Sequence, residues 1–347
     1  MYKRQPLLRI EFHSAHAVLL HNLDRLDEAA RALQSQIDET RVAGETGEHA
    51  PIQLSLAAVQ LRRGSADAAL HHAQVAVAEQ PDFDLGGVVP AYTRFLLGCA
   101  HCAKGRYGDG LALLAAARQL LEPQSRGTPV HSNTEAALAE VLLQIGQPAK
   151  ALQTLVGEPA QLTPACQVRR WLVRAAILRT LGQDNRSMLD AAQALVEQGA
   201  GEHWRQQTEI EGARRLAPHA AIDLCTSVLT RARRHGDRPV SLLAATVRLD
   251  ALRRASDADR LDEAAFEVLE QLRGCQTTLI YRPEVHLACA RAFAAAGQSG
   301  LADQCLVEAR DWIREVALPN LPDELRHGFL FRCAVNMAIQ GEASQRT

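Results

Sequence analysis

Lysine and aromatic residues are scarce in this 347-residue sequence. Lysine stands only at positions 3, 104 and 150, so the basic charge comes from arginine, and the net charge is −2. This balance gives no general electrostatic attraction to nucleic acid or to an anionic membrane. Aromatic residues make up 4% of the chain, which leaves the packing to alanine and leucine. Such a composition favours close-packed helices over a β-sheet.

Long hydrophobic runs and patterned cysteines are missing too. No apolar run approaches the roughly 20 residues that cross a bilayer. Near the N-terminus, Arg9, Glu11 and His13 interrupt the apolar stretch, so we expect no secretory signal there. The eight cysteines are scattered through apolar helical patterns and form no disulfide framework. Free thiols fit a reducing compartment, so we expect a cytoplasmic location and no membrane partner.

Catalytic and cofactor motifs are also absent from the sequence. It contains no GxxxxGK(S/T) phosphate loop, no GxSxG nucleophile turn, no HExxH and no GxGxxG at a strand-to-helix junction. No constellation of titratable residues marks a reaction centre. The sequence therefore predicts no enzyme, no catalytic residue, no cofactor and no metal site.

Four clusters allow a functional and a structural interpretation. Cys99-Ala100-His101-Cys102 supplies three of the four ligands of a closed zinc site, but its helical setting favours buried structural thiols over metal or redox chemistry. A surface position is favoured for His71-His72, and solvated acids for Glu209 and Glu211. The basic run 231–235 ends a helix, where it complements the helix dipole; an anion site is the alternative. No helical segment of the sequence shows the basic, exposed pattern of a DNA-recognition helix, so we expect no direct binding of nucleic acid.

What the sequence does contain is a spacing that repeats about every 40 residues. A residue suited to a helix turn is followed five residues later by alanine, glycine or serine. The pairs are Asp24/Ala29, Gly64/Ala69, Gly105/Gly110, Gly146/Ala151, Gly182/Ser187, Asp259/Ala264 and Gly297/Ala302. Glycine suits the left-handed residue that ends a helix. Periods of this size indicate helical hairpins that bury their apolar faces against their neighbours in a stack.

A second column of small residues supports this register. It stands seven positions before six of the turns, at Ala17, Ala57, Gly98, Ala139, Ala175 and Ala290. The two columns face each other across each hairpin and let its helices approach closely. The spacing predicts units at about 7–43, 51–80, 90–122, 131–157, 164–199, 202–236, 238–274 and 282–318. We expect a disordered or non-native leader at 1–6, a capping segment at 319–340 with one helix from about 323, and a disordered tail at 341–347.

These columns resemble the tetratricopeptide repeat (TPR). Leu97-Gly98, Trp171 and Pro81 stand where that family places Leu-Gly, Trp and Pro. The period here, about 36–41 residues, exceeds the family's 34, and Leu and Ala replace most of its aromatic positions. The resemblance covers nearly all of residues 7–318. It implies an all-α, right-handed superhelical solenoid of about eight TPR-like hairpins with a C-terminal capping helix.

The two ends of the chain carry further resemblances. Pro319-Asn320-Leu321-Pro322, Arg326, Phe329-Leu330 and Asn336 resemble the ending of bacterial multidomain regulators, such as LuxR-type ATPase activators and repeat-bearing nucleotide cyclases. Those proteins place an ATPase, cyclase or other signalling module upstream of a repeat array. The opening Met-Tyr-Lys-Arg-Gln resembles a leader read into a fragmentary reading frame. These resemblances imply the C-terminal fragment of a larger regulator, while a purely structural cap also explains the tail.

The TPR register indicates where a ligand would lie. In that family the first helix of each unit lines the concave face, and the same register places there Tyr92, Glu140, Arg169, Arg179, Glu284 and Arg291. Arg169 and Arg179 are suited to grip a carboxylate or phosphate through paired N–H groups, with solvated surface charges as the alternative. We expect a non-catalytic region that binds a protein segment or small effector and acts on an upstream ATPase, cyclase or DNA-binding module. A free-standing TPR-like scaffold that assembles a multiprotein complex is the alternative.

Overall fold

The computed structural model of the protein describes residues 20, 23–43, 49–79, 88–125, 128–155, 157 and 162–344, and every regular element in these ranges is a helix. The helices are α2 (Leu26–Ala43), α3 (His49–Arg62), α4 (Ala66–Glu79), α5 (Val88–Ala103), α6 (Tyr107–Ser125), α7 (Pro129–Gln144), α8 (Pro148–Thr154), α9 (Pro164–Thr180), α10 (Arg186–Glu197), α11 (Glu202–Ala213), α12 (Pro218–His235), α13 (Arg238–Arg254), α14 (Ala258–Arg273), α15 (Arg282–Ala295), α16 (Ser299–Asp311), the π-helical turn η2 (Trp312–Ala317), the 3-10 turn η3 (Leu318–Asn320), α17 (Asp323–Phe331) and α18 (Ala334–Ser344). None of these helices is both long and apolar enough to cross a membrane.

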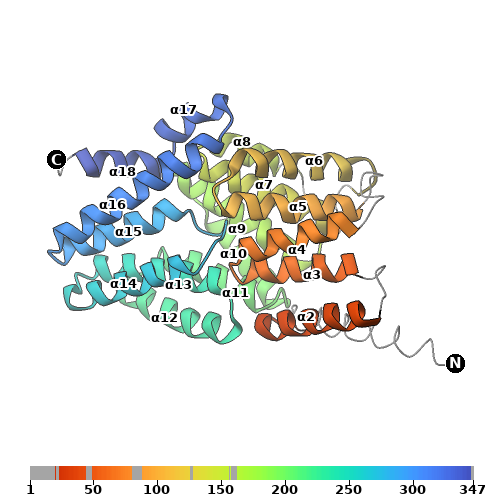
Figure 1. Ribbon diagram of the computed structural model, residues 1–347. Coiled ribbons are helices and arrows are strands. Elements are labelled where there is room, and N and C mark those ends of the chain that lie inside the picture. Colours follow the sequence, from red (N-terminus) through yellow and green to blue (C-terminus); the bar gives the residue numbers. More distant parts are fainter. Residues whose placement is uncertain are drawn as a thin grey trace.

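The helices form hairpins that pack against the next hairpin in chain order (Figure 1). This is the all-α solenoid that the repeat columns predict. The predicted leader at 1–6 and most of the first helix of unit one lie outside the described residues. Unit boundaries drawn from the spacing stay a prediction.

The hairpin turns use the left-handed backbone that the glycine column predicts. Positive φ angles occur at Asp24 (58°), Gly64 (72°), Gly105 (78°), Gly146 (75°), Gly182 (69°) and Gly297 (79°). Unit seven departs from the predicted column, because its left-handed residue is Ser256 (φ 57°) and Asp259 already lies inside α14. There the Asp257 N–H donates to the Leu252 carbonyl and closes α13 two residues before Asp259.

The small columns allow close approach of paired helices, most clearly in the α5–α6 hairpin. A Cβ atom on Gly110 would lie 2.2 Å from Cys102 Sγ and 2.9 Å from the Gly98 carbonyl oxygen. Only glycine fits at that distance. In unit two the same two columns hold Ala57 and Ala69, which are 0% and 1% exposed.

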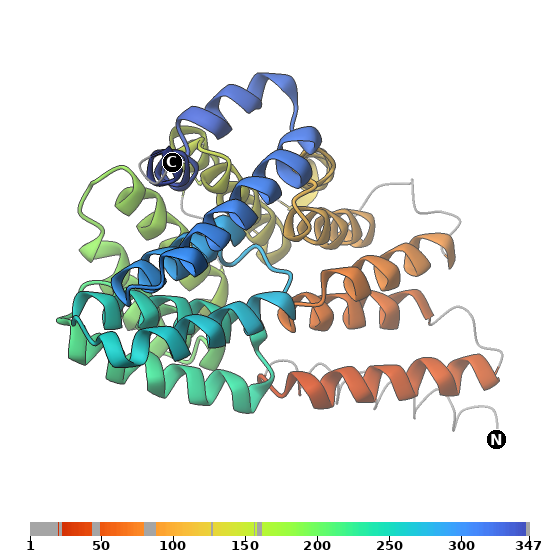
Figure 2. The same ribbon diagram turned by 60° about the vertical axis from the view of Figure 1, so that its left-hand side comes forward.

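The solenoid curls until its early turns touch its late units (Figure 2). A Cβ on Gly64 would lie 2.6 Å from Cys275 Sγ, and one on Gly105 would lie 2.8 Å from the Trp312 ring. A Cβ on Gly146 would lie 2.8 Å from the Cys333 backbone nitrogen. Three successive turns therefore serve as contact points between the two halves of the chain.

The C-terminal cap consists of two helices, α17 and α18, where one helix is expected from the sequence. The helix breaks at Arg332, and the Cys333 N–H returns to the Gly328 carbonyl at 3.2 Å. α18 then packs on α15 and α16 and continues to Ser344, past the expected end at 340, because Glu342 pairs with Arg291 at 2.7 Å.

A buried asparagine holds the cap to unit eight. Asn336 is 0% exposed, accepts a hydrogen bond from the Tyr281 hydroxyl at 2.9 Å and donates to the Phe329 carbonyl at 2.8 Å. The Asn and Phe of the tail that resemble bacterial regulators are thus structural residues in this chain.

Candidate binding site

Two adjoining cavities open among the first helices of the hairpins. The arginine chamber, about 410 Å³, lies between α7, α9, α11, α13, α15 and the break between α17 and α18 of the cap. The aromatic chamber, about 430 Å³, lies between α3, α5, α7, α9 and α11. Each has the size of a ligand pocket. Their walls have five residues in common: Glu140, Arg169, Gln207, Thr278 and Leu279.

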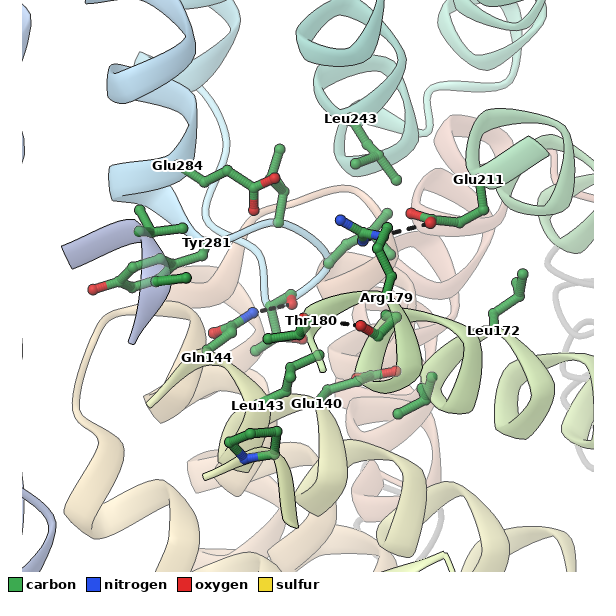
Figure 3. A pocket seen from close by; sticks show the side chains of 18 of the residues that line it. Glu140, Leu143, Gln144, Leu172, Arg179, Thr180, Glu211, Leu243, Tyr281 and Glu284 are labelled. Carbon is green, nitrogen blue, oxygen red and sulfur yellow. Dashed lines mark hydrogen bonds and ion pairs between the residues drawn. The ribbon is translucent and has the colours of Figure 1, made fainter. Parts of the chain in front are cut away.

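Charge in the arginine chamber is concentrated around Glu211 (Figure 3). Arg214 Nε lies 3.1 Å from one carboxylate oxygen of Glu211, and Arg179 lies 3.5 Å from the other. Burial would raise the pKa of Glu211, but Arg214 and Arg179 hold it below its ordinary value. Arg214 also faces Glu284 at 3.8 Å.

The balance of charge in this chamber is basic. Four arginines line it (Arg169, Arg179, Arg214 and Arg332) against three glutamates (Glu140, Glu211 and Glu284). Arg332 enters from the break between α17 and α18, so the cap contributes directly to the chamber wall. The guanidinium groups provide donors for a carboxylate or phosphate.

A bidentate ion pair lies between the two chambers. Arg169 on α9 donates through Nε and Nη2 to the two carboxylate oxygens of Glu140 on α7, at 3.1 and 2.8 Å. Arg169 Nη1 also reaches Asn133 Oδ1 at 3.4 Å. Both charged side chains are mostly covered, at 16% and 21% exposure, so the pair is a fixed part of the wall.

The aromatic chamber is lined mainly by uncharged side chains along α5. Tyr92 and Phe95 stack with their ring centroids 5.9 Å apart, and Trp204 on α11 faces the same space. Burial raises the pKa of both Tyr92 and Cys99 to about 12, so both groups are neutral. This wall is suited to an apolar or aromatic side chain.

Another part of the wall of the aromatic chamber is a buried polar cluster, which we call the clasp: Asp24, Arg62, His203 and Asp237. Arg62 lies 2.7 Å from Asp24 and 3.1 Å from Asp237. His203 contributes its backbone N–H to Asp24 at 3.1 Å and its ring Nδ1 to Asp237 at 2.7 Å. The clasp joins α3 to the starts of α11 and α13.

The protonation state of the clasp follows from its geometry. Burial would raise the pKa of Asp237, but His203 and Arg62 hold it well below its ordinary value, so the carboxylate only accepts hydrogen bonds. Nδ1 of His203 must then carry the proton, and Nε2 accepts from the Gln207 amide at 2.6 Å. Burial and then Arg62 lower the pKa of His203, which favours this neutral ring.

The structure brings five of the six predicted site residues to the chamber walls. Tyr92 lines the aromatic chamber, Arg179 and Glu284 line the arginine chamber, and Glu140 and Arg169 line both. Arg291 does not join them. It lies two helical turns beyond Glu284, where α18 covers α15, and it pairs with Glu342. Contact of any of these residues with a ligand stays a prediction.

Sequence reasoning missed the contribution of α11. Gln207, Glu211 and Arg214 stand at i, i+4 and i+7 and therefore share one helix face. Unit six lacks the small-residue columns, which hid its register. The expectation that Glu211 is a solvated acid is wrong, because the two arginines enclose it. The helical spacing of these three polar residues could have indicated that they share one face of a helix.

The remaining clusters have ordinary partners. Cys99 and Cys102 are both buried, and no group of three or more His, Cys, Asp or Glu within the described ranges is placed to hold a metal. His72 bonds Gln53 at 2.7 Å, while His71 is exposed. In the basic run, Arg231 pairs with Glu202 and Glu209, and Arg233 pairs with Glu267.

Comparison with known proteins identifies the fold alone. No described protein family and no curated protein matches the sequence. A Rap protein complexed with Competence and Sporulation Factor is similar in structure, with a TM-score of 0.52 at 10% identity over 98% of this chain and 99% of that chain. The TPR domain of P58(IPK) aligns over 96% of this chain and 99% of that chain at 13% identity, but with a TM-score of only 0.26. The similarity to the Rap protein supports an all-α helical-repeat fold and no more.

Proposed function

We propose that this protein is a non-catalytic binding module that holds an extended segment of a partner protein inside its superhelix. The observation that carries the proposal is the pair of adjoining chambers, one basic and one aromatic, built from the first helices of successive hairpins. A segment with an apolar side chain for the aromatic chamber and an acidic group for the arginine chamber matches both walls. A small anionic effector would use the arginine chamber alone.

The state of the chamber groups supports binding over catalysis. Glu211 has a lowered pKa and two arginine partners, which makes it a poor general base. Cys99 has its thiol pKa raised to about 12 by burial, which makes it a poor nucleophile. The Rap neighbour was solved in complex with a separate factor, which supports a binding use of the same fold.

The regulatory part of the proposal rests on the tail and its resemblance to bacterial multidomain regulators. We propose that the array at 7–318 and its cap bind a ligand and thereby regulate an ATPase, cyclase or DNA-binding module encoded upstream in the same reading frame. Sequencing the genomic DNA upstream tests this directly, since such a module in frame is the expected result. A complete gene without one favours the free-standing TPR-like scaffold.

The binding proposal is tested with a random peptide library displayed on its own mRNA and selected against the purified protein. Peptides that bind the chambers should lose at least about tenfold in affinity in the variants Ala176→Trp, which fills the arginine chamber, and Arg169→Met. Fluorescence anisotropy with each selected peptide gives the comparison.

The matched control is Ala294→Trp, which adds the same ring to an exposed position of α15 that lines neither chamber. Affinity for a selected peptide should not change in this variant. A selection that enriches no peptide, or only peptides equally sensitive to Ala294→Trp, would overturn the proposal.

A further inference from the structure

The connection between α14 and α15 runs along the walls of the two chambers. We call residues 275–280 the strap. They are non-helical; Cys275 and Ile280 at the two ends are only 3% and 4% exposed, and residues 276–279 between them are partly exposed. Thr278 and Leu279 line both chambers, so the strap forms part of the division between them. In Figure 2 the strap leaves α14 beside the α3–α4 turn and then crosses towards α15.

The first half of the strap is held by unit two. The Gln276 backbone N–H donates to the Gly64 carbonyl at 2.7 Å. Its side chain accepts from the Asp67 backbone N–H at 3.1 Å and donates to the Asp67 carboxylate at 2.7 Å. These contacts span 209 residues of sequence, so unit two holds this segment from outside its own hairpin.

The second half of the strap is held by unit four. The Gln144 side-chain amide at the end of α7 donates to the Thr278 carbonyl at 2.5 Å (Figure 3). A carboxamide that bonds a main-chain carbonyl recognises the backbone and not a particular side chain. The strap is therefore held through its backbone on both sides, as a bound peptide would be.

No buried charge depends on the strap. Residues 275–280 are Cys-Gln-Thr-Thr-Leu-Ile, without an ionisable acid or base other than the thiol. The Arg169–Glu140 pair and the Glu211 pairs join first helices only. Asp67 keeps Lys104 as a partner when Gln276 leaves. Removal of the strap would break a few hydrogen bonds, each contributing about 1 kcal/mol, and would expose the buried side chains of Cys275 and Ile280, but it would leave these ion pairs intact.

We propose that the strap is an intramolecular occupant of the binding site, and that a partner segment long enough to span both chambers binds by displacing it. Six residues reach at most about 20 Å when fully extended, which is the upper limit of the span that such a segment replaces. Displacement also releases Gly64 and Gln144 from unit seven, so binding loosens the contact between the two halves of the solenoid. This inference rests on the proposed function and adds its regulation.

Hydrogen exchange of the unmodified protein tests whether the strap is detachable. The Gln276 amide should exchange through local opening, at least about 100-fold faster than the slowest amides of α13 and α15 and with little dependence on urea. An amide that exchanges only with global unfolding, at the rate and urea dependence of α13, would show a fixed wall and overturn the proposal.

A peptide supplied in trans tests the occupant role. The probe is a fluorescent synthetic peptide with the sequence of residues 274–281 and serine in place of the cysteine. It should bind the variant Gln276→Gly/Thr277→Gly/Leu279→Gly at least about tenfold more tightly than the unmodified protein, because the freed site accepts it. Gln298→Ala, which loses a comparable exposed glutamine–aspartate bond to Asp262, should bind the probe like the unmodified protein.

The outcomes separate the strap from the binding proposal. Two outcomes would reject the proposal that the strap occupies the binding site. One is equal affinity of the probe for the unmodified and triple-glycine proteins. The other is no binding of the probe to a triple-glycine protein that melts cooperatively. Library peptides that still depend on Ala176 would leave the binding proposal standing in that case. If the triple-glycine variant does not fold, the exchange measurement on the unmodified protein decides.

Discussion

Arg62 at the end of α3 reaches Asp237 at the start of α13 across 3.1 Å, although 175 residues separate them in the chain. The same guanidinium bonds Asp24 at 2.7 Å, so one cation is shared by two carboxylates that are 7% and 2% exposed. The solenoid is thus closed by a buried charge cluster as well as by apolar contact. This cluster also lines the aromatic chamber, so the contact between the early and late units and the binding site share the same residues.

Replacement of the clasp cation should strongly destabilise the fold. Arg62→Met leaves the buried carboxylates of Asp24 and Asp237 without their shared cation. Removing one partner of a buried ion pair costs about 3–5 kcal/mol. The free energy of unfolding from urea titration at pH 7.5 gives the value. Arg273→Met is the matched control, because Arg273 and Glu270 are 76% and 78% exposed and such pairs contribute at most about 1 kcal/mol. Similar losses in the two variants would contradict a closing role for the clasp.

Acid should weaken the clasp through His203. Its pKa in the folded protein lies below the ordinary 6.5, with burial as the first cause and Arg62 as the second. The unfolded chain therefore takes up a proton as the pH falls through about 6.5 while folded His203 stays neutral, so stability decreases on acidification. No such contribution exists above that pH, where the ring is neutral in both states.

The variant His203→Gln isolates this effect, since the other buried histidines remain. Urea midpoints at pH 7.5 and 5.5 should differ less in the variant than in the unmodified protein. Asp237 does not contribute in this window, because its lowered pKa affects stability only as the pH falls below the ordinary 3.8. Equal pH dependence in both proteins would show that His203 does not have a depressed pKa.

The repeat spacing was sufficient to predict the hairpins because it reports local geometry. A left-handed turn residue and two small residues at fixed offsets are properties of one hairpin, and they recur. Even so, identical sequence does not guarantee identical structure. Asp-Arg-Leu-Asp-Glu-Ala-Ala occurs at 24–30 and at 259–265, yet Asp24 has a φ of 58° whereas Asp259 lies inside α14. The second copy follows a helix end at Ser256 that has already made the turn.

The clasp and the strap could not be predicted in the same way. Asp24 shows in the sequence only as a turn residue, and nothing near Asp237 indicates Arg62 as its partner. Whether the array curls far enough to bring them together depends on small rotations summed over several units. The first helices, by contrast, place one face inward by their own periodicity. That is why Tyr92, Glu140, Arg169, Arg179 and Glu284 could be chosen from the sequence while the strap could not.

The turn glycines should divide into two classes on substitution. Gly182→Ala meets no neighbour within 4 Å and suffers only the left-handed backbone, a cost of about 1–2 kcal/mol. Gly146→Ala has the same backbone strain, and its Cβ would also lie 2.8 Å from the Cys333 nitrogen and 2.9 Å from the Gly328 carbonyl oxygen. We expect a further loss of about 1–3 kcal/mol from this overlap. Thermal unfolding of both variants measures the difference, and equal melting temperatures would show that the unit-four turn does not press on the cap.

Loss of the buried asparagine should separate the cap from unit eight. Asn336→Ala leaves the Tyr281 hydroxyl and the Phe329 carbonyl without their partner in a buried site, at a cost of about 1–3 kcal/mol. Exposed Asn320, whose side chain bonds the Val316 carbonyl at 2.7 Å, is the matched control, and Asn320→Ala should change stability by no more than about 0.5 kcal/mol. Urea titration compares the two, and trypsin cleavage after Arg332 should accelerate only in Asn336→Ala, because α18 then leaves its place on α15. If both variants resist urea and trypsin alike, Asn336 does not hold the cap, and the arginine chamber does not depend on it for the position of Arg332.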